Sequence, residues 1–310
     1  MAHFHLLPEG VTVFERGWLS ANNILFHARG PTALVDSGYA THSAQTVALV
    51  QQALGARPLD LLINTHLHSD HCGGNAALQA GYSGVRTLVP PGLAEQVRHW
   101  NPVALTYQPT GQHCPQFRMD GLLRPGSKIA LGGRAWDVHG APGHDPHSIV
   151  LFEPGERVLI SADALWENGF GVVFQELEGK QGFAEVLATL DLIEALRPLV
   201  VIPGHGRPFG GREPVATALA NARRRLSRFV ADPASHARHA AKVLLKFKLL
   251  ELQRIGYAQL EQWAMATPYF PLIRSRYFPG LQLRELFRSL VDDLVTAGAI
   301  RTAAGEVFNA

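Results

Sequence analysis

Residues 65–71, Thr-His-Leu-His-Ser-Asp-His, constrain the fold more than any other part of the chain. They place three imidazoles and a carboxylate directly after the apolar run 59–64, which predicts a short buried strand. Alternate side chains of a nearly extended segment point to one side, so His66, His68 and Asp70 can face one way and the last histidine another. Imidazole and carboxylate suit zinc, and also iron or manganese. This strand end therefore predicts a metal site that can face two ions.

Three further stretches place candidate ligands at the ends of predicted strands. In each, proline or small residues permit a tight turn, and the ligands are His144, Asp163 and His205. Taken alone, a Pro-Gly-His turn or a His-rich polar loop needs no metal. Four such clusters in one chain, with five histidines and two aspartates between them, predict a shared metal centre.

Composition indicates a globular protein with a sizeable core. The chain has 310 residues, of which 46% are hydrophobic and 17% charged. Its two cysteines, Cys72 and Cys114, cannot form a disulfide framework, which favours a reducing compartment. The N-terminus lacks a basic-then-apolar signal pattern, and no apolar run approaches the length of a membrane span. We therefore expect a cytoplasmic protein with no membrane partner.

The first two thirds of the chain mix short strands with helices. Predicted strands cover 11–14, 23–26, 32–36, 59–64, 86–89, 135–140, 148–152, 157–161 and 199–202. One helix is predicted to begin near Thr41 or Ser43. Further helices are predicted over 75–80, 92–100 and 182–196. Residues 101–126 contain several prolines and are expected to form a loop over the site.

From about residue 214 the pattern becomes helical. Helices are predicted over 215–230, 239–252, 258–264 and 283–297, followed by a hairpin over 299–309. Residues 223–310 carry 14 lysines and arginines against 7 acidic residues, whereas residues 1–222 have a net charge of −5. We predict two domains, a catalytic domain over 1–225 and a small helical, winged-helix-like domain over 226–310.

The ligand pattern resembles that of the metallo-β-lactamase superfamily. The resemblance covers roughly residues 10–215 and is carried by an ordered series: Asp36, His66-Leu67-His68-Ser69-Asp70-His71, His144, Asp163 and His205. It implies an α+β fold, an αββα sandwich with a two-metal site at one edge of the sheets. The helical tail is similar to that of the subgroup that includes lactamase-like endoribonucleases and relatives of hydroxyacylglutathione hydrolase.

The resemblance also implies a role for each residue of the series. One ion would be bound by His66, His68 and His144. The second would be bound by Asp70, His71 and His205, and the carboxylate of Asp163 would bridge both ions. Asp36 would orient a ligand rather than bind metal. The two divalent ions are expected to be zinc, with iron or manganese as alternatives. A hydroxide bridging ions about 3.5–4 Å apart would attack the substrate, with Asp70 and Asp163 as the catalytic carboxylates.

Other polar residues have less defined roles. His147 and Trp166 follow predicted ligands and are candidates for the substrate pocket or for supporting a ligand. Cys72 is expected to pack as a small residue. The basic run 223–228 is interpreted as a solvated helix face, with contact to an anionic substrate as the alternative.

Asp163 and the basic tail narrow the choice of substrate without identifying it. The antibiotic-hydrolysing members generally lack an aspartate at the position of Asp163, so we expect a hydrolase of a small thioester, ester or lactone. The first alternative is an endoribonuclease acting on single-stranded RNA through the basic tail. A mononuclear iron sulfur dioxygenase is the second alternative, and a non-catalytic scaffold is disfavoured by the complete ligand set. A homodimer is a further hypothesis.

Overall fold

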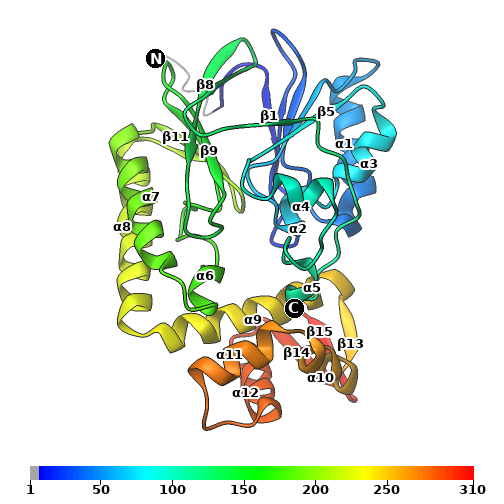
Figure 1. Ribbon diagram of the computed structural model, residues 1–310, viewed down its shortest axis with the longest axis vertical. Coiled ribbons are helices and arrows are strands. Elements are labelled where there is room, and N and C mark those ends of the chain that lie inside the picture. Colours follow the sequence, from blue (N-terminus) through cyan, green and yellow to red (C-terminus); the bar gives the residue numbers. More distant parts are fainter. Residues whose placement is uncertain (1–6) are drawn as a thin grey trace.

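The computed structural model describes residues 7–310, and its larger part is a four-layer sandwich (Figure 1). Residues 1–6, on which the expectation of no signal segment partly rests, lie outside the described residues. One sheet has the order β1 (Val11–Phe14), β2 (Asn23–Phe26), β3 (Ala33–Val35), β4 (Leu61–Ile63), β5 (Arg86–Val89) and β6 (Gly121–Leu122). The other has the order β12 (Phe209–Gly210), β11 (Val200–Pro203), β10 (Val158–Ala162), β9 (Ile149–Glu153), β8 (Arg134–Gly140) and β7 (Lys128–Leu131).

Helices cover the outer face of each sheet. The first sheet is covered by α1 (Ser43–Leu54) and α3 (Asn75–Gly81), the second by α7 (Gly182–Leu196) and α8 (Arg212–Ala231). In β10, Val158 and Ile160 join the core between the sheets, while Leu159 joins the core beneath α7 and α8. This two-residue alternation lets apolar strands bury both faces. The predicted αββα sandwich is confirmed.

Strand ends from both sheets meet at the edge of the sandwich nearest the C-terminal helices. β10 and β11 are parallel neighbours, so the residues that follow them, Asp163 and His205, leave the sheet at the same edge. In the first sheet, β4 leads through residues 64–68 into the short helix α2 (Ser69–Cys72). The predicted ligand loops are therefore brought together by the topology.

Shorter elements border this edge. They are the 3-10 helix η1 (Ala40–His42), α4 (Ala94–Arg98), α5 (Tyr107–Thr110) and α6 (Phe174–Leu177). Residues 101–126, predicted as an irregular loop, contain α5 and β6 and pack Leu105, Tyr107 and Phe117 into a buried cluster. Apolar side chains thus hold this segment against the sandwich.

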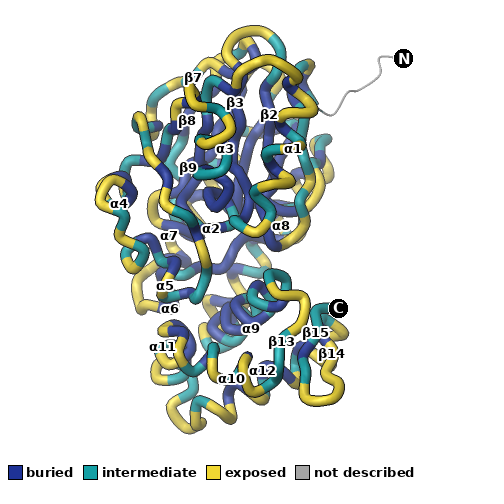
Figure 2. Tube along the Cα trace, turned by 90° about the vertical axis from the view of Figure 1, so that its right-hand side faces the viewer, coloured by how far each residue is buried: buried dark blue, intermediate teal, exposed yellow. Residues whose placement is uncertain are grey.

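The C-terminal part has its own core and its own sheet. Its elements are α9 (Pro233–Leu252), β13 (Arg254–Gly256), α10 (Tyr257–Ala266), α11 (Tyr269–Tyr277), α12 (Leu283–Thr296), β14 (Ile300–Ala303) and β15 (Glu306–Asn309). The predicted hairpin is β14–β15, and β13 adds to it as a third strand. α11 was not expected. Figure 2 shows α9, whose residues are mostly buried or half-buried, between the sandwich and the more exposed outer helices. The predicted boundary at 225/226 falls within α8, and the division into two domains stays a prediction.

Candidate metal centre

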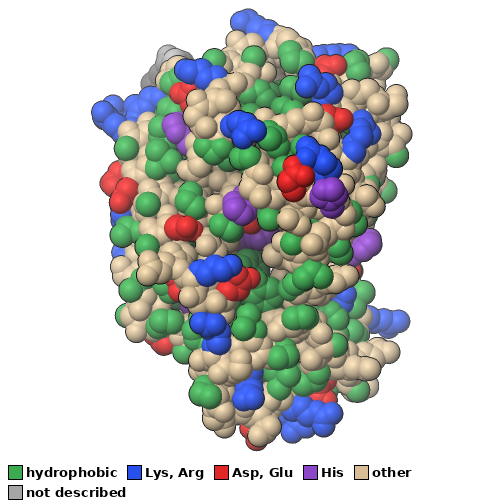
Figure 3. Space-filling view, viewed as in Figure 1, with side chains coloured by type: hydrophobic (Ala, Val, Ile, Leu, Met, Phe, Trp, Pro, Cys, Tyr) green, Lys and Arg blue, Asp and Glu red, His purple; other side chains and the backbone are tan. Residues whose placement is uncertain are grey.

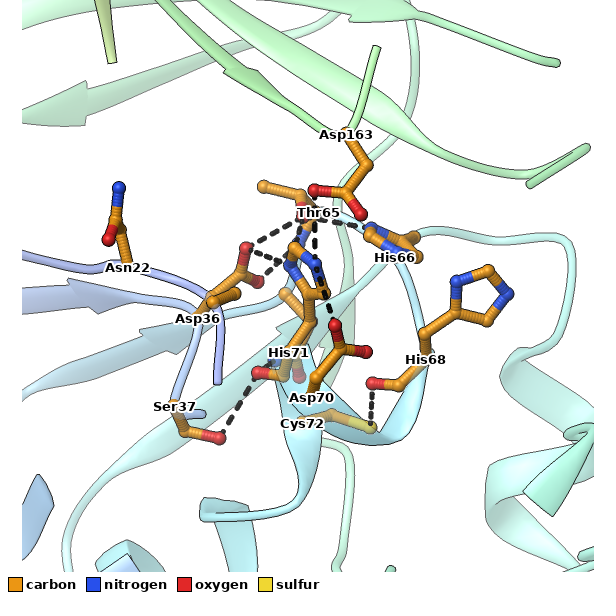
Figure 4. A network of polar contacts seen from close by, with 12 residues as sticks. Asn22, Asp36, Ser37, Thr65, His66, His68, Asp70, His71, Cys72 and Asp163 are labelled. Carbon is orange, nitrogen blue, oxygen red and sulfur yellow. Dashed lines mark hydrogen bonds and ion pairs between the residues drawn. The ribbon is translucent and has the colours of Figure 1, made fainter. Parts of the chain in front are cut away.

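The seven predicted ligands converge as two groups at the sandwich edge. The groups are His66, His68 and His144, and Asp70, His71, Asp163 and His205. Within each group the donor atoms lie within 4.8 Å of one another. Asp163 faces both groups. Its Oδ1 lies 3.4 Å from His71 Nε2 (Figure 4), and its Oδ2 lies 3.4 Å from His144 Nε2. Asp163 thus lies between the two groups.

Three histidines have their Nδ1 atoms fixed by groups that can only accept. His71 Nδ1 donates to Asp36 Oδ2 at 2.7 Å. His144 Nδ1 donates to the carbonyl of Val172 at 2.6 Å, and His205 Nδ1 to that of Gly17 at 3.1 Å. Because carboxylate and carbonyl oxygens cannot donate, each Nδ1 carries a proton, and Nε2 is the ring nitrogen that remains to bind a metal ion.

Thr65 extends this support to His66. The Thr65 hydroxyl donates to Asp36 Oδ2 at 2.8 Å, and His66 Nδ1 lies 3.2 Å from the same hydroxyl, which accepts its proton. His68 has the opposite orientation. Its Nε2 lies 3.8 Å from Asp145 Oδ2, whereas its Nδ1 faces His144 Nε2 at 2.8 Å. Four of the five histidines are therefore oriented by a hydrogen-bond partner outside the ligand set, and His68 is the exception.

The residues fit divalent cations. In the described part of the chain, His66 Nε2 and His71 Nε2 are buried without a hydrogen-bond partner. A buried ring nitrogen without a partner is costly, and a metal ion in each group would satisfy these atoms.

Electrostatics act differently on the two groups of candidate ligands. Burial lowers the pKa of His71 and of His205, but the carboxylates that face them outweigh it and raise both pKa values, so metal binding would displace a proton from each of these imidazoles. Burial lowers the pKa of His66 well below its ordinary value and that of His68 to about 4, so both imidazoles are neutral at neutral pH. Burial opposes ionisation of Asp163, but the neighbouring His205 and His71 hold the pKa of this carboxyl well below its usual range. Neutral imidazoles and an ionised carboxylate are the forms that coordinate metal.

A cavity of about 560 Å³ opens onto the ligands. Figure 3 shows the hollow between the sandwich and the C-terminal helices, with histidine and apolar side chains inside it. Its aromatic lining residues are Trp18, Trp166, Phe170, Phe174 and Phe247. Trp166 also donates from Nε1 to Asp163 Oδ1 at 3.2 Å, so it both borders the cavity and supports a candidate ligand.

Other sequence candidates lie away from the ligands. His147 is exposed and does not line the cavity; its ring packs over Gly92. Cys72 is buried, with its Sγ 3.2 Å from the His68 carbonyl and 3.8 Å from Cys114 Sγ. The thiol thus packs behind the ligand loop.

Sequence reasoning missed three residues that support the site. Trp18, 59% exposed, stacks on His205 with ring centroids 5.5 Å apart. Asn22 donates from Nδ2 to the carbonyls of Pro203 and Gly206, which flank the His205 turn. Asp145 directly follows His144, and this adjacency was the only sequence signal among the three.

The family follows from comparison with known proteins. Residues 16–205 match the model of the metallo-beta-lactamase superfamily. The chain belongs to the metallo-β-lactamase superfamily. Its two His/Asp groups suit divalent metal ions.

Curated relatives of this metallo-β-lactamase superfamily member are hydrolases. It is 32% identical over 161 residues to a hydroxyacylglutathione hydrolase of Anaeromyxobacter dehalogenans, covering 51% of this chain and 52% of the relative. It is also 32% identical over 181 residues to the acyl-coenzyme A thioesterase MBLAC2 of Gallus gallus, covering 50% and 59%. The chain thus spans about half the length of these relatives.

Solved structures share the fold over nearly the whole chain. A metallo-beta-lactamase family protein from Thermus thermophilus matches with a TM-score of 0.55 and 21% identity, covering 99% of this chain and 100% of that one. A beta-lactamase domain protein from Burkholderia ambifaria matches with a TM-score of 0.57 and 21% identity, covering 98% and 92%. No helix within residues 7–310 is long and apolar enough to cross a membrane.

Proposed function

We propose that the protein hydrolyses a small thioester, with oxygen esters and lactones as related substrates, using two divalent metal ions held by the seven ligands. The observation that carries this proposal is the cavity that joins the ligands to an apolar wall. At one end it is bordered by His68, Asp163 and His205, and at the other by Val243 and Phe247 of α9. Its volume, about 560 Å³, is in the range of small-molecule pockets.

The names of the relatives support the thioester class. One group is named for hydroxyacylglutathione and the other for acyl-coenzyme A, and both are thioesters. An acyl chain can lie against Phe170, Phe174 and Phe247, since burial of apolar surface stabilises it there. This arrangement directs the acyl carbon toward the ligand end of the cavity.

The chain's residues have distinct roles in this proposal. The first ion would be held by His66, His68 and His144, the second by Asp70, His71 and His205, and Asp163 would contact both. When bound, such ions polarise a carbonyl group and lower the pKa of a water molecule to about 7.

Two residues position reacting groups without needing to bind the acyl chain. Asp70 borders the cavity and would accept a hydrogen bond from the attacking water. Trp166 holds the Asp163 carboxylate in place through its indole N–H. Loss of either contact would misplace the reacting groups more than it would weaken substrate binding.

The RNA and dioxygenase alternatives stay predictions, as do the homodimer and the cytoplasmic location. Tyr269 and Phe270 are buried in the core of the C-terminal part, and Trp263 packs against that core. These aromatic side chains of the basic tail therefore serve packing rather than base stacking. The small-substrate proposal is the one that the cavity supports best.

A substrate comparison tests the proposal. Zinc-loaded protein is assayed with a thioester, an oxygen ester and a lactone of matched acyl length, and with a single-stranded RNA. We expect the thioester to have the highest kcat/KM. His68→Ala should lose at least about 100-fold of it, because a candidate ligand is removed. His99→Ala, at an exposed histidine on the surface, is the matched control. Cleavage of RNA without hydrolysis of any ester would contradict the proposal.

A further inference from the structure

Arg225 of α8 lines the cavity that contains the candidate ligands. Its neighbours in the basic run do not. Arg223 pairs with Asp191 and Glu194 at 2.7 Å each, and Arg224 is exposed. The expectation of a solvated helix face thus fits Arg224, whereas Arg225 faces the cavity, and its contact with an anionic substrate stays a prediction.

Arg225 has no acidic partner. None of the ion pairs among residues 7–310 includes it, and its Nε is buried without a hydrogen-bond acceptor. Its Nη2 donates to His239 Nε2 at 2.7 Å. Burial, reinforced by the charge of Arg225, lowers the pKa of His239 to about 3. His239 therefore supplies a neutral acceptor and leaves the guanidinium charge uncompensated.

The guanidinium is held in place by its surroundings. It lies over the rings of Phe170 and Phe229, with its Cζ 5.5 and 5.4 Å from their centroids. Gly169 has φ of 129°, and a Cβ at this position would lie 2.8 Å from Arg225 Nη1. Cation–π contacts offset part of the cost of burying the charge, and the glycine makes room for it. The side chain is thus positioned before any substrate arrives.

The other charges around the cavity already have partners. Arg207 pairs with Glu167 at 3.2 Å. Lys246 donates to the carbonyl of Ala299 and to the Asn309 side chain. The remaining carboxylates, Asp70 and Asp163, belong to the candidate metal centre. Arg225 is therefore the cation of this cavity, within the described residues, that lacks an oxygen partner.

We propose that Arg225, braced by His239, is an anion-binding subsite that selects substrates carrying a carboxylate or phosphate group. The identity of the reacting bond rests on the proposed function, but the subsite does not. The two ends of a guanidinium fork match the oxygens of either anion. The substrate would place its acyl carbon at the metal centre and its anionic group against Arg225.

Binding of inert analogues tests the subsite without turnover. Isothermal titration calorimetry of the zinc-loaded full chain compares three octyl thioethers that end in a carboxylate, a phosphate or a neutral amide. We expect at least one anion to bind about ten-fold or more tighter than the amide. Arg225→Gln should reduce this preference to about three-fold or less. Arg224→Gln, which changes an exposed neighbour on the same helix, should retain it.

The outcomes are decisive in both directions. A preference for carboxylate or for phosphate that is lost in Arg225→Gln supports the subsite and identifies its anion. Arg225→Met is the second variant if Arg225→Gln does not fold. Absence of a preference for the anions in the wild type overturns the proposal. Retention of the wild-type preference in either folded variant also overturns it, because it is the result expected of an anion held by the metal ions alone.

The proposed function is tested separately with the matching octanoyl thioesters. If the anionic analogues bind in an Arg225-dependent manner but none of the thioesters is hydrolysed, the function is wrong and the subsite stands. If all three thioesters are hydrolysed with equal kcat/KM and the analogues bind equally, the function stands and the subsite is wrong.

Discussion

Asp36 Oδ2 lies 2.7 Å from His71 Nδ1, and this buried contact connects the end of β3 to the short helix α2. The other oxygen of Asp36 accepts the backbone N–H of Thr65 at 2.9 Å (Figure 4). Asp36 has φ of 59°, in the left-handed region that few residues other than glycine adopt. The hydrogen bonds of its carboxylate hold the residue in this conformation, so its role in orienting ligands comes with a local backbone cost.

Asp36→Asn should weaken metal binding without removing a candidate ligand. An amide offers only one acceptor oxygen, so it cannot serve both the Thr65 N–H and His71 Nδ1. We expect about 10–100-fold weaker zinc affinity, measured by competition with a chelator. Asp137→Asn, which removes a carboxylate paired with Lys128 on β7, is the control and should keep wild-type affinity. Equal zinc affinity in the two variants would refute this role of Asp36.

Asp163→Ala should affect both ions. Its two oxygens face histidines of different groups, so we expect zinc content to fall from about two ions per chain to less than one. Elemental analysis measures this, and circular dichroism checks that the fold survives. One iron and an empty second position in carefully loaded wild-type protein would instead favour the mononuclear dioxygenase alternative.

The positions of the candidate ligands could be predicted from sequence because each lies in the segment that directly follows a short apolar strand. The supporting residues Asn22 and Trp18 could not, since they come from a segment with no periodic pattern and reach His205 only through the fold. α9 begins six residues earlier than predicted. The signal was present, because Asp232 accepts the N–H of Ser235 at 3.0 Å and a proline follows the cap.

The basic run shows a different limit of sequence reasoning. Successive helix residues point about 100° apart, so three adjacent arginines cannot share one environment. Arg223 meets acidic residues of α7, Arg224 meets solvent and Arg225 enters the cavity. The packing of α8 decides which of the three arginines meets acidic residues, which meets solvent and which enters the cavity. β13 was not predicted for the same reason, because it depends on a contact that is distant in the sequence. Its three residues form a strand only by pairing with β15, about fifty residues later.

The buried His236 of α9 should make stability depend on pH. Its Nε2 accepts the N–H of Val173 at 3.2 Å, and burial, with the charge of Arg225, lowers its pKa to about 4 from 6.5. The unfolded chain therefore takes up this proton first as the pH falls. His236 contributes about 3 kcal/mol to the free energy of unfolding above pH 6.5, and this is lost as the pH falls through about 4.

His236→Gln isolates this contribution, because the amide oxygen can still accept the Val173 N–H but does not titrate. Urea denaturation from about pH 7 to about pH 4 should give a weaker loss of stability in the variant, by up to one proton in the linkage slope. Titration of the metal centre is common to both proteins and cancels in the comparison. Identical pH dependence in the two proteins would show that folding leaves the pKa of His236 unchanged.

Salt dependence should separate the small-substrate function from the ribonuclease alternative. Binding of RNA through several phosphates weakens steeply with salt because counterions are released, whereas a neutral substrate releases none. We expect kcat/KM for a neutral thioester to change less than about two-fold between low and physiological salt. On the ribonuclease alternative, RNA cleavage would fall several-fold, and charge reversal of Arg223, Arg224 and Arg225 would reduce it further. Efficient, strongly salt-sensitive RNA cleavage that is abolished by His68→Ala would overturn our preference for a small substrate.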